Sequence, residues 1–252
     1  MSEKKDNGVI PKVFKILSAF IDESDQWGVR DLASHLDLPI STLHRFLKSL
    51  QDQGMLEYNP DTRKYQIGME LYRIGSVLST KFDFKKIAQP FLKSFVNKFD
   101  ETICLVLYHK KYKKVMFLDQ VVGSSPFQYV INIGDLQPVP YGSSGKSIMA
   151  YLEREEVEQI LNLESFDTHQ KNKIIKELKE IREEGVAFSF GERVEGARGI
   201  AAPIFDSSKS PIGSVIFASP IKDLEEKYEM ELSQEIQAIA LKISKQLGYA
   251  EE

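Results

Sequence analysis

The chain has 252 residues, of which 42% are hydrophobic and 28% charged, which is the composition of an ordinary soluble globular protein with room for two modest domains. Its one cysteine, Cys104, excludes an intramolecular disulfide, and the sequence shows neither a signal peptide nor a membrane-spanning run, so we expect a cytoplasmic protein. The net charge is −4, and the acidic excess lies in residues 86–252, whereas residues 1–85 hold 12 basic and 12 acidic side chains and can still present a basic face.

The N-terminal third has the pattern of three short helices. Apolar residues recur at helical spacing over 10–21, and again over 29–36. A third helix is expected from about Pro39 to Gly54, with Ser41 or Thr42 as its N-cap. Two helices joined by a tight turn are typical of a helix-turn-helix, although a generic three-helix bundle has the same pattern.

The third helix has two different faces. Its apolar positions would pack inward: Leu43, Phe46, Leu47 and Leu50. Its small polar and basic positions would face outward: Ser41, Thr42, His44, Arg45 and Lys48. An outward face of this kind favours a recognition helix, since such side chains can reach base edges and phosphates in a major groove. The alternative is a solvated surface without a ligand.

The residues after this helix change the balance between the two interpretations. Segments 55–58 and 64–67 alternate apolar and polar residues, and the turn formers of 59–63 separate them. A hairpin at this place is a wing, and Arg63 and Lys64 near its tip can reach phosphates or a minor groove. The order of helix, helix-turn-helix and wing therefore favours DNA binding.

The remaining two-thirds predict a connecting helix followed by an α+β domain. Residues 68–80 form an apolar stripe whose exposed side needs a partner. Further helices are expected at 86–99, 153–163, 170–184 and 225–247, and strands at 102–108, 115–119, 127–133, 199–206 and 212–219. Strands grouped as hairpins with helices between them indicate a mostly antiparallel sheet.

The stretch PYGSSGKSIMA at 140–150 looks like the end of a phosphate-binding P-loop. A P-loop requires Gly where Pro140 stands, and it belongs to a parallel α/β core, so a nucleotide-hydrolysing enzyme is not expected. The stretch instead predicts a helix beginning near Gly145, whose free N–H groups and dipole favour a small anion. The alternative is a plain N-cap with a tight turn.

Residues 31–75, DLASHLDLPISTLHRFLKSLQDQGMLEYNPDTRKYQIGMELYRIG, resemble the winged helix-turn-helix of the IclR family of bacterial transcription regulators. The similarity extends over roughly residues 8–248 and includes GVAFSFGERVEGARGIAAP at 185–203. It implies four segments: a disordered tail at 1–8, a winged helix-turn-helix at 9–68, a linker helix at 69–85, and a GAF-like effector-binding and oligomerisation domain at 86–252. It also implies a repressor acting as a homodimer or homotetramer on double-stranded operator DNA.

The resemblance also implies roles for individual residues. Ser41, Thr42, His44 and Arg45 would lie near base edges, whereas Lys48, Arg63 and Lys64 would hold phosphates. The effector site, where loop N–H groups hold a ligand carboxylate, would comprise Ser143, Ser144, Gly145, Ser189, Gly199, Ile216 and Ala218. Because these last four positions carry few polar groups and little bulk, they favour a larger or more apolar effector. Lys146 and Glu192 are expected to be structural.

No catalytic site, metal or cofactor is expected. The four histidines show no metal-ligand spacing, Cys104 sits in an apolar strand with no partner base, and no nucleophile elbow is found. The sequence therefore predicts a ligand-responsive DNA-binding regulator. The alternatives kept open are a small-molecule-binding enzyme or P-loop-like nucleotide-binding protein with a DNA-binding head, and a protein-binding module whose hairpin mediates assembly.

Overall fold

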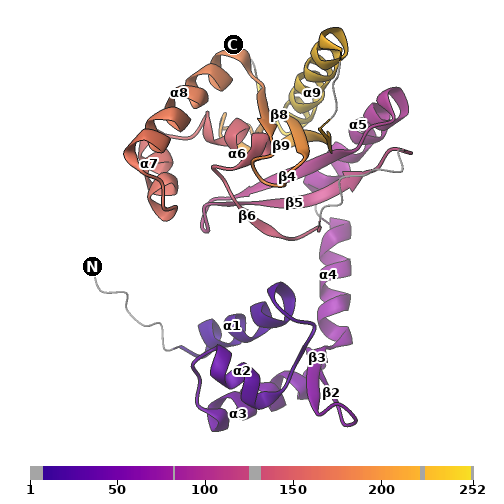
Figure 1. Cartoon of the computed structure of the whole chain (residues 1–252). Coiled ribbons are helices and arrows are strands. Elements are labelled where there is room, and N and C mark those ends of the chain that lie inside the picture. The colour runs from indigo at the N-terminus through magenta and orange to yellow at the C-terminus, as the bar shows by residue number, and fades with distance from the viewer. Residues whose placement is uncertain (1–7, 82, 125–131, 222–224, 251–252) are drawn as a thin grey trace. The chain divides into compact units, whose positions relative to one another are not determined.

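A computed structural model of the chain describes residues 8–81, 83–124, 132–221 and 225–250, and it divides into two compact units on either side of the Phe82–Asp83 bond (Figure 1). Of the tail expected at 1–8, only Gly8 lies within the described residues, and of the strand expected at 127–133, only the last two residues do.

Three helices and a small antiparallel sheet form the core of unit 1. The helices are α1 (Val9–Asp22), α2 (Val29–His35) and α3 (Ile40–Asp52), and the strands, in the order β1-β3-β2, are β1 (Gln26–Trp27), β2 (Leu56–Asn59) and β3 (Lys64–Ile67). The buried faces of the helices pack together with Leu56 and Tyr65 of the wing. The three helices and the hairpin were predicted, whereas β1, tied to α1 by a 3.0 Å hydrogen bond from Trp27 Nε1 to the Ala19 carbonyl, was not.

The start of α3 differs from the prediction. Its N-cap is Pro39, and Ser41 and Thr42 lie inside the first turn, so neither caps the helix. The first intrahelical bond runs from the Leu43 N–H to the Pro39 carbonyl at 2.9 Å. Proline has its φ preset near −65°, and here φ is −58°, so this residue directs the chain into the helix without a side-chain cap. The hydroxyls of Ser41 and Thr42 are therefore not used by a cap.

The last helix of unit 1 is α4 (Met69–Lys81), and it carries exposed apolar side chains. Met69 and Tyr72 are each 70% exposed and Leu78 is 61% exposed. Glu70 and Arg73 form an ion pair of 2.6 Å on the same helix. Large apolar side chains that stay exposed in a single chain indicate a surface for a partner.

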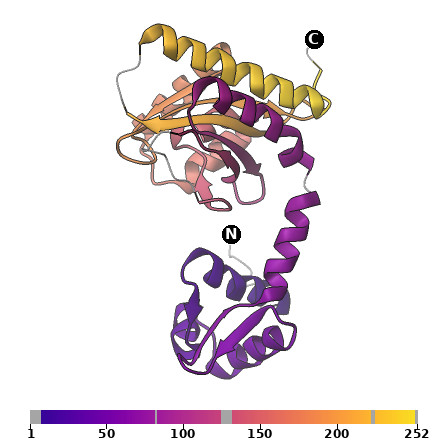
Figure 2. The same cartoon turned by 90° about the vertical axis from the view of Figure 1, so that its right-hand side faces the viewer.

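Unit 2 is a six-stranded antiparallel sheet with helices on both faces (Figures 1 and 2). The strands, in the order β6-β5-β4-β9-β8-β7, are β4 (Ile103–His109), β5 (Lys114–Val121), β6 (Leu136–Pro138), β7 (Ala187–Phe190), β8 (Ala197–Phe205) and β9 (Pro211–Pro220). One face packs on α5 (Asp83–Phe99) and α9 (Glu226–Gln246), and the other on α6 (Gly142–Met149), α7 (Arg154–Leu163) and α8 (Thr168–Glu184). The predicted fold class, an α+β domain with a mostly antiparallel sheet beside a winged helix-turn-helix, is confirmed.

Local differences from the sequence analysis concern short or shifted elements. The edge strands β6 and β7 were not predicted. Helix α6 begins at Gly142, three residues before the expected Gly145, and α5 begins at Asp83 rather than Lys86. The linker helix ends at Lys81. Among the described residues, no helix is long and apolar enough to cross a membrane.

Candidate nucleic-acid interface and effector cavity

The outer face of α3 is open to solvent. Ser41, His44, Arg45 and Lys48 are exposed and Thr42 is half-buried, whereas all four predicted inward positions are buried. The Arg45 guanidinium lies 5.8 Å from the Phe46 ring centroid, and Lys48 Nζ lies 3.1 Å from Asp52 Oδ1. An exposed ion pair of this kind is weak, so a phosphate can compete for the lysine.

The wing presents the other two predicted contacts at its tip. Arg63 and Lys64 are both exposed, and Arg63 adopts a left-handed φ of 56° in the turn between β2 and β3. The turn is shaped by Asn59, whose Oδ1 accepts hydrogen bonds from the backbone N–H groups of Asp61 at 2.9 Å and Thr62 at 3.2 Å. This Asx-type turn fixes where the two basic side chains begin.

A small cavity of about 30 Å³ lies in unit 2 where the first turn of α6 faces strands β7, β8 and β9. Six of the seven residues predicted for the effector line it: Ser143, Ser144, Ser189, Gly199, Ile216 and Ala218. The strand register explains why distant residues meet, because Ser189 pairs with Gly199, which in turn pairs with Ala218. Ile216 lies two residues from Ala218 on the same face of the sheet.

Gly145 does not line the cavity, and a glycine is needed at this position for packing. A Cβ at this position would stand 2.0 Å from the Val139 carbonyl oxygen, which no side chain can do. The glycine therefore lets α6 lie against the segment before it. At Gly199 a Cβ would stand 2.6 Å from Ser143 Oγ, so this glycine keeps the cavity open.

Two buried hydroxyls belong to the cavity wall without a protein partner. Ser143 is 0% and Ser144 1% exposed, and among the described residues neither Oγ has a hydrogen-bond partner. Buried polar groups are nearly always satisfied, and leaving one unsatisfied costs about 1–3 kcal/mol. Both hydroxyls lie on the first turn of α6, where backbone N–H groups also lack intrahelical partners. The arrangement can therefore accept a polar, and best an anionic, ligand group.

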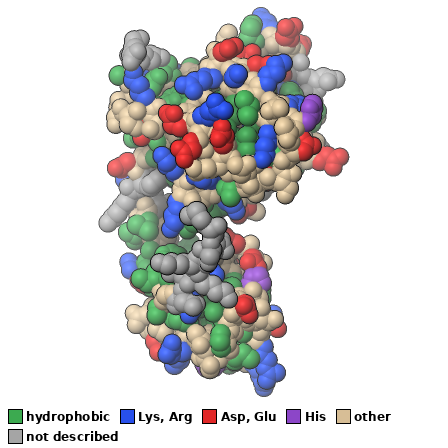
Figure 3. Space-filling model, turned by 90° about the vertical axis from the view of Figure 1, so that its left-hand side faces the viewer, with side chains coloured by type: hydrophobic (Ala, Val, Ile, Leu, Met, Phe, Trp, Pro, Cys, Tyr) green, Lys and Arg blue, Asp and Glu red, His purple; other side chains and the backbone are tan. Residues whose placement is uncertain are grey.

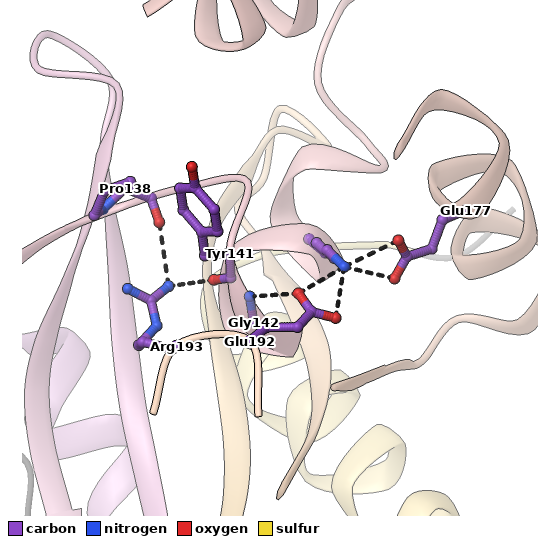
Figure 4. Close-up of polar contacts among 7 residues, drawn as sticks. Pro138, Tyr141, Gly142, Glu177, Glu192 and Arg193 are labelled. Carbon is purple, nitrogen blue, oxygen red and sulfur yellow. Dashed lines mark hydrogen bonds and ion pairs between the residues drawn. The ribbon is translucent and has the colours of Figure 1, made fainter. Parts of the chain in front are cut away.

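Ion pairs hold the first turn of α6 in place (Figure 4). Glu192 accepts a 3.0 Å hydrogen bond from the Gly142 N–H and a 2.8 Å bond from Lys146 Nζ. Lys146, whose side chain is only 6% exposed, also contacts both carboxylate oxygens of Glu177 at 2.8 and 2.9 Å. A buried ammonium bound by two carboxylates joins α6 to α8 and to the β7–β8 loop, which is consistent with the structural role expected for Lys146 and Glu192. Glu177 was not anticipated, because it lies 31 residues from Lys146.

The loop between β7 and β8 covers part of the cavity and is fixed by Arg193. Its guanidinium donates hydrogen bonds to the carbonyls of Pro138, at 3.2 Å, and Tyr141 (Figure 4). Arg193 and the neighbouring Val194 both line the cavity. Arg198, 5% exposed, lines it too and pairs with Glu229 of α9. The charged side chains that line the cavity are thus two guanidinium groups, one of them paired with Glu229, and the carboxylate of Glu192.

Metal ligands and the one cysteine were the other candidates for a chemical site in unit 2. Among the described residues, no group of three or more His, Cys, Asp or Glu side chains could hold a metal ion. Cys104 is fully buried in β4, and burial raises the pKa of its thiol. A thiol with a raised pKa is inert as a nucleophile.

Two family models match the chain. IclR helix-turn-helix domain matches residues 9–60, and Bacterial transcriptional regulator IclR C-terminal matches residues 77–245. Among curated relatives, the HTH-type transcriptional regulator KipR of Bacillus subtilis is 22% identical over 249 residues, covering 96% of this chain and 98% of the relative. The transcriptional repressor IclR of Escherichia coli is 23% identical over 242 residues, covering 94% and 87%.

Solved structures share the fold along the whole chain. IclR of Thermotoga maritima superposes with a TM-score of 0.70 at 24% identity, covering 95% of this chain and 98% of that one. An IclR homologue from Microbacterium hydrocarbonoxydans, solved in complex with 4-hydroxybenzoate, has a TM-score of 0.78 at 20% identity, covering 95% and 99%.

Proposed function

Because the chain belongs to the IclR family of bacterial transcriptional regulators, we propose that it is a cytoplasmic repressor that binds double-stranded operator DNA and responds to a small metabolite. The observation that carries the proposal is the division of α3 into a buried apolar face and an exposed polar and basic face. Relatives whose names state a function are regulators of transcription rather than enzymes, and we assign no catalytic step to this chain.

The exposed face of α3 would enter the major groove. Ser41, Thr42, His44 and Arg45 would approach base edges there, and Lys48, Arg63 and Lys64 would contact phosphates. Phosphate contacts fix the register of a protein on DNA, whereas base-edge contacts give it sequence specificity. Arg45 is best suited to a base because its planar guanidinium can bond a guanine edge with two hydrogen bonds.

The experiment that tests this assignment compares Arg45→Ala with the unchanged chain on operator DNA and on random DNA. We expect Arg45→Ala to lose about 1–3 kcal/mol of binding free energy on the operator, all of it from one base pair, with little change on random DNA. Fluorescence anisotropy with single-base operator variants measures both quantities. An equal loss on both DNAs would reduce Arg45 to a phosphate contact, and no loss on either would remove α3 from the interface.

The cavity at the start of α6 would be the effector site. Ser143 and Ser144 supply hydroxyls that lack partners, and the helix N-terminus favours a carboxylate. The structural neighbour in complex with 4-hydroxybenzoate, a carboxylate, supports this ligand class. Gly145 would act indirectly, by letting α6 reach its position.

The size of the cavity sets a condition on the effector. A volume of about 30 Å³ has room for about two or three water molecules, since one water needs about 10–15 Å³ by the same measure. The larger or more apolar effector that the sequence favours therefore requires the loop at residues 191–196 to move. Both ends of this loop are glycines in the left-handed region, Gly191 at φ 66° and Gly196 at φ 77°, which suit a hinge.

The exposed apolar faces of unit 1 support a homo-oligomer. On α1 the side chains of Ile10, Phe14 and Ile21 are 65–70% exposed, in addition to those of α4. We propose that a second copy covers these faces, so that two recognition helices read a palindromic operator. The effector would then act by binding one arrangement of the two heads more tightly than another.

A further inference from the structure

A second and larger hollow lies at the other end of α6, between α7 and α8. Its volume is about 390 Å³, and its floor is apolar, formed by Met149, Leu152, Val157 and Leu178. Met149 and Leu178 are almost completely buried, whereas Ile175 at the margin is 38% exposed. We call this hollow the α7–α8 groove. Its volume falls within the range of about 300–1,000 Å³ that is common for small-molecule sites.

Two cations on the margin of the groove have no acidic partner. Lys179 and Arg182 stand one helical turn apart on α8. Among the described residues, no carboxylate lies within 4.0 Å of either, whereas on α7 Arg154 and Glu158 pair with each other at 2.9 Å. The Arg182 guanidinium instead lies 5.4 Å from the ring centroid of Tyr151. Figure 3, which views the side of unit 2 that carries α7 and α8, shows hydrophobic side chains gathered among charged ones.

We propose that the α7–α8 groove binds an amphipathic carboxylate, with its acyl or aryl-alkyl chain on the apolar floor and its carboxylate between Lys179 and Arg182. An apolar floor alone would accept any apolar molecule, but two cations without an acidic partner at one side favour a ligand with a negatively charged group. A phosphate group would leave most of the floor uncovered. A cationic amphiphile would be repelled.

The same charges argue against a second copy of the chain as the occupant. A two-fold contact centred on the groove would place Lys179 and Arg182 near their own counterparts. Like charges facing one another across such a contact are destabilising. A small carboxylate meets both the apolar and the electrostatic requirement without this repulsion.

The groove lies at the opposite end of α6 from the effector cavity. Met149 and Ala150 border the groove, while Ser143 and Ser144 line the cavity, and a helix of eight residues is only about 12 Å long. Any coupling between the two occupants is reciprocal. A groove ligand that shifts α6 would therefore change the affinity for the effector by the same factor as the effector changes the affinity for the groove ligand. This coupling rests on the proposed function, whereas binding in the groove does not.

Isothermal titration of the full chain with octanoate tests the proposal, with octyltrimethylammonium as the ligand of opposite charge. We expect saturable octanoate binding and none for the ammonium compound. The double variant Lys179→Glu and Arg182→Glu should bind octanoate about tenfold more weakly, because two attractions become repulsions. Lys242→Glu on α9 is the control, since it makes the same change of charge at an exposed residue that does not line the groove, and it should bind as the unchanged chain does.

Two further measurements distinguish octanoate bound in the groove from octanoate bound elsewhere, and a free groove from one covered by a second copy. Ser144→Tyr fills the effector cavity, so it should leave octanoate binding unchanged, and loss of binding in this variant would place octanoate in the effector cavity and overturn the proposal. Sedimentation velocity of the double variant should show the oligomer of the unchanged chain. A changed oligomer would mean that a second copy covers the groove. Equal octanoate affinity in the double variant would also overturn the proposal, even if the effector response proved normal.

Discussion

Replacing Gly199 with alanine tests whether the cavity at the start of α6 binds the effector or is only a gap in the packing. The new Cβ would stand 2.6 Å from Ser143 Oγ and 3.1 Å from both Ile216 Cδ1 and Ser189 Oγ. The cavity measures about 30 Å³, so a methyl group that projects into it would leave less room for a ligand. Overpacking costs about 1–3 kcal/mol, and the change from glycine to alanine within a strand returns about 0.5–1 kcal/mol. The net loss of stability should thus be about 0–2.5 kcal/mol, which leaves the chain folded.

The expected phenotype of Gly199→Ala is a repressor that responds to its effector more weakly. Operator affinity, measured by fluorescence anisotropy, should be unchanged, while the effector concentration needed to alter DNA binding should rise at least about tenfold. Gly75→Ala is the matched control, because its Cβ meets nothing within 4 Å. Thermal denaturation checks that both variants are folded. An unchanged effector midpoint in Gly199→Ala would refute the assignment of the cavity.

Two other predictions address the wing and the core of unit 2. Lys64→Ala should reduce the slope of log affinity against log salt by about 0.9, the value for one lost phosphate contact. The control Lys176→Ala in unit 2 should leave this slope unchanged. An unchanged slope in Lys64→Ala would remove the Lys64 side chain from the interface. Cys104 should react with a thiol reagent such as DTNB only as fast as unit 2 opens, because burial removes access and raises the pKa of its thiol. Immediate reaction of the native chain at neutral pH, at the rate seen in urea, would show that β4 is not buried as described.

Long amphipathic elements were predictable because their apolar spacing is set by burial of one face. Helices α8 and α9 and strand β4 were located to within about two residues on this basis. The strands that were not predicted have two to four residues, too few for an alternation to be distinguished from chance: β1, β6 and β7. The predicted N-cap of α3 was wrong for another reason. Ser41 and Thr42 have side chains that can cap a helix, but Pro39 already sets the helical direction.

The effector cavity depended on information that local patterns do not contain. Ser143 and Ser144 were suggested by the composition of one loop, but Ser189 and Ala218 were reached only through the resemblance. Their neighbourhood follows from strand register, which joins residues far apart in the chain. The contacts of Lys146 with Glu177 and Glu192 have the same character, because these partners lie 31 and 46 residues away in the chain. Gly145 shows the converse, since a glycine that looks like a ligand contact in the sequence is required by the Val139 carbonyl.

The closed state of the cavity bears directly on how tightly any effector can bind. In this state Arg193 bonds two carbonyls of the segment before α6, and Glu192 bonds both Gly142 and Lys146. An effector larger than the cavity must bind a conformation in which the 191–196 loop has moved, so its apparent dissociation constant is the intrinsic one divided by the populated fraction of that conformation. In the proposed function, the contacts of Glu192 and Arg193 would therefore set the sensitivity of the response, while Ser143 and Ser144, whose hydroxyls have no partner among the described residues, would set its chemistry.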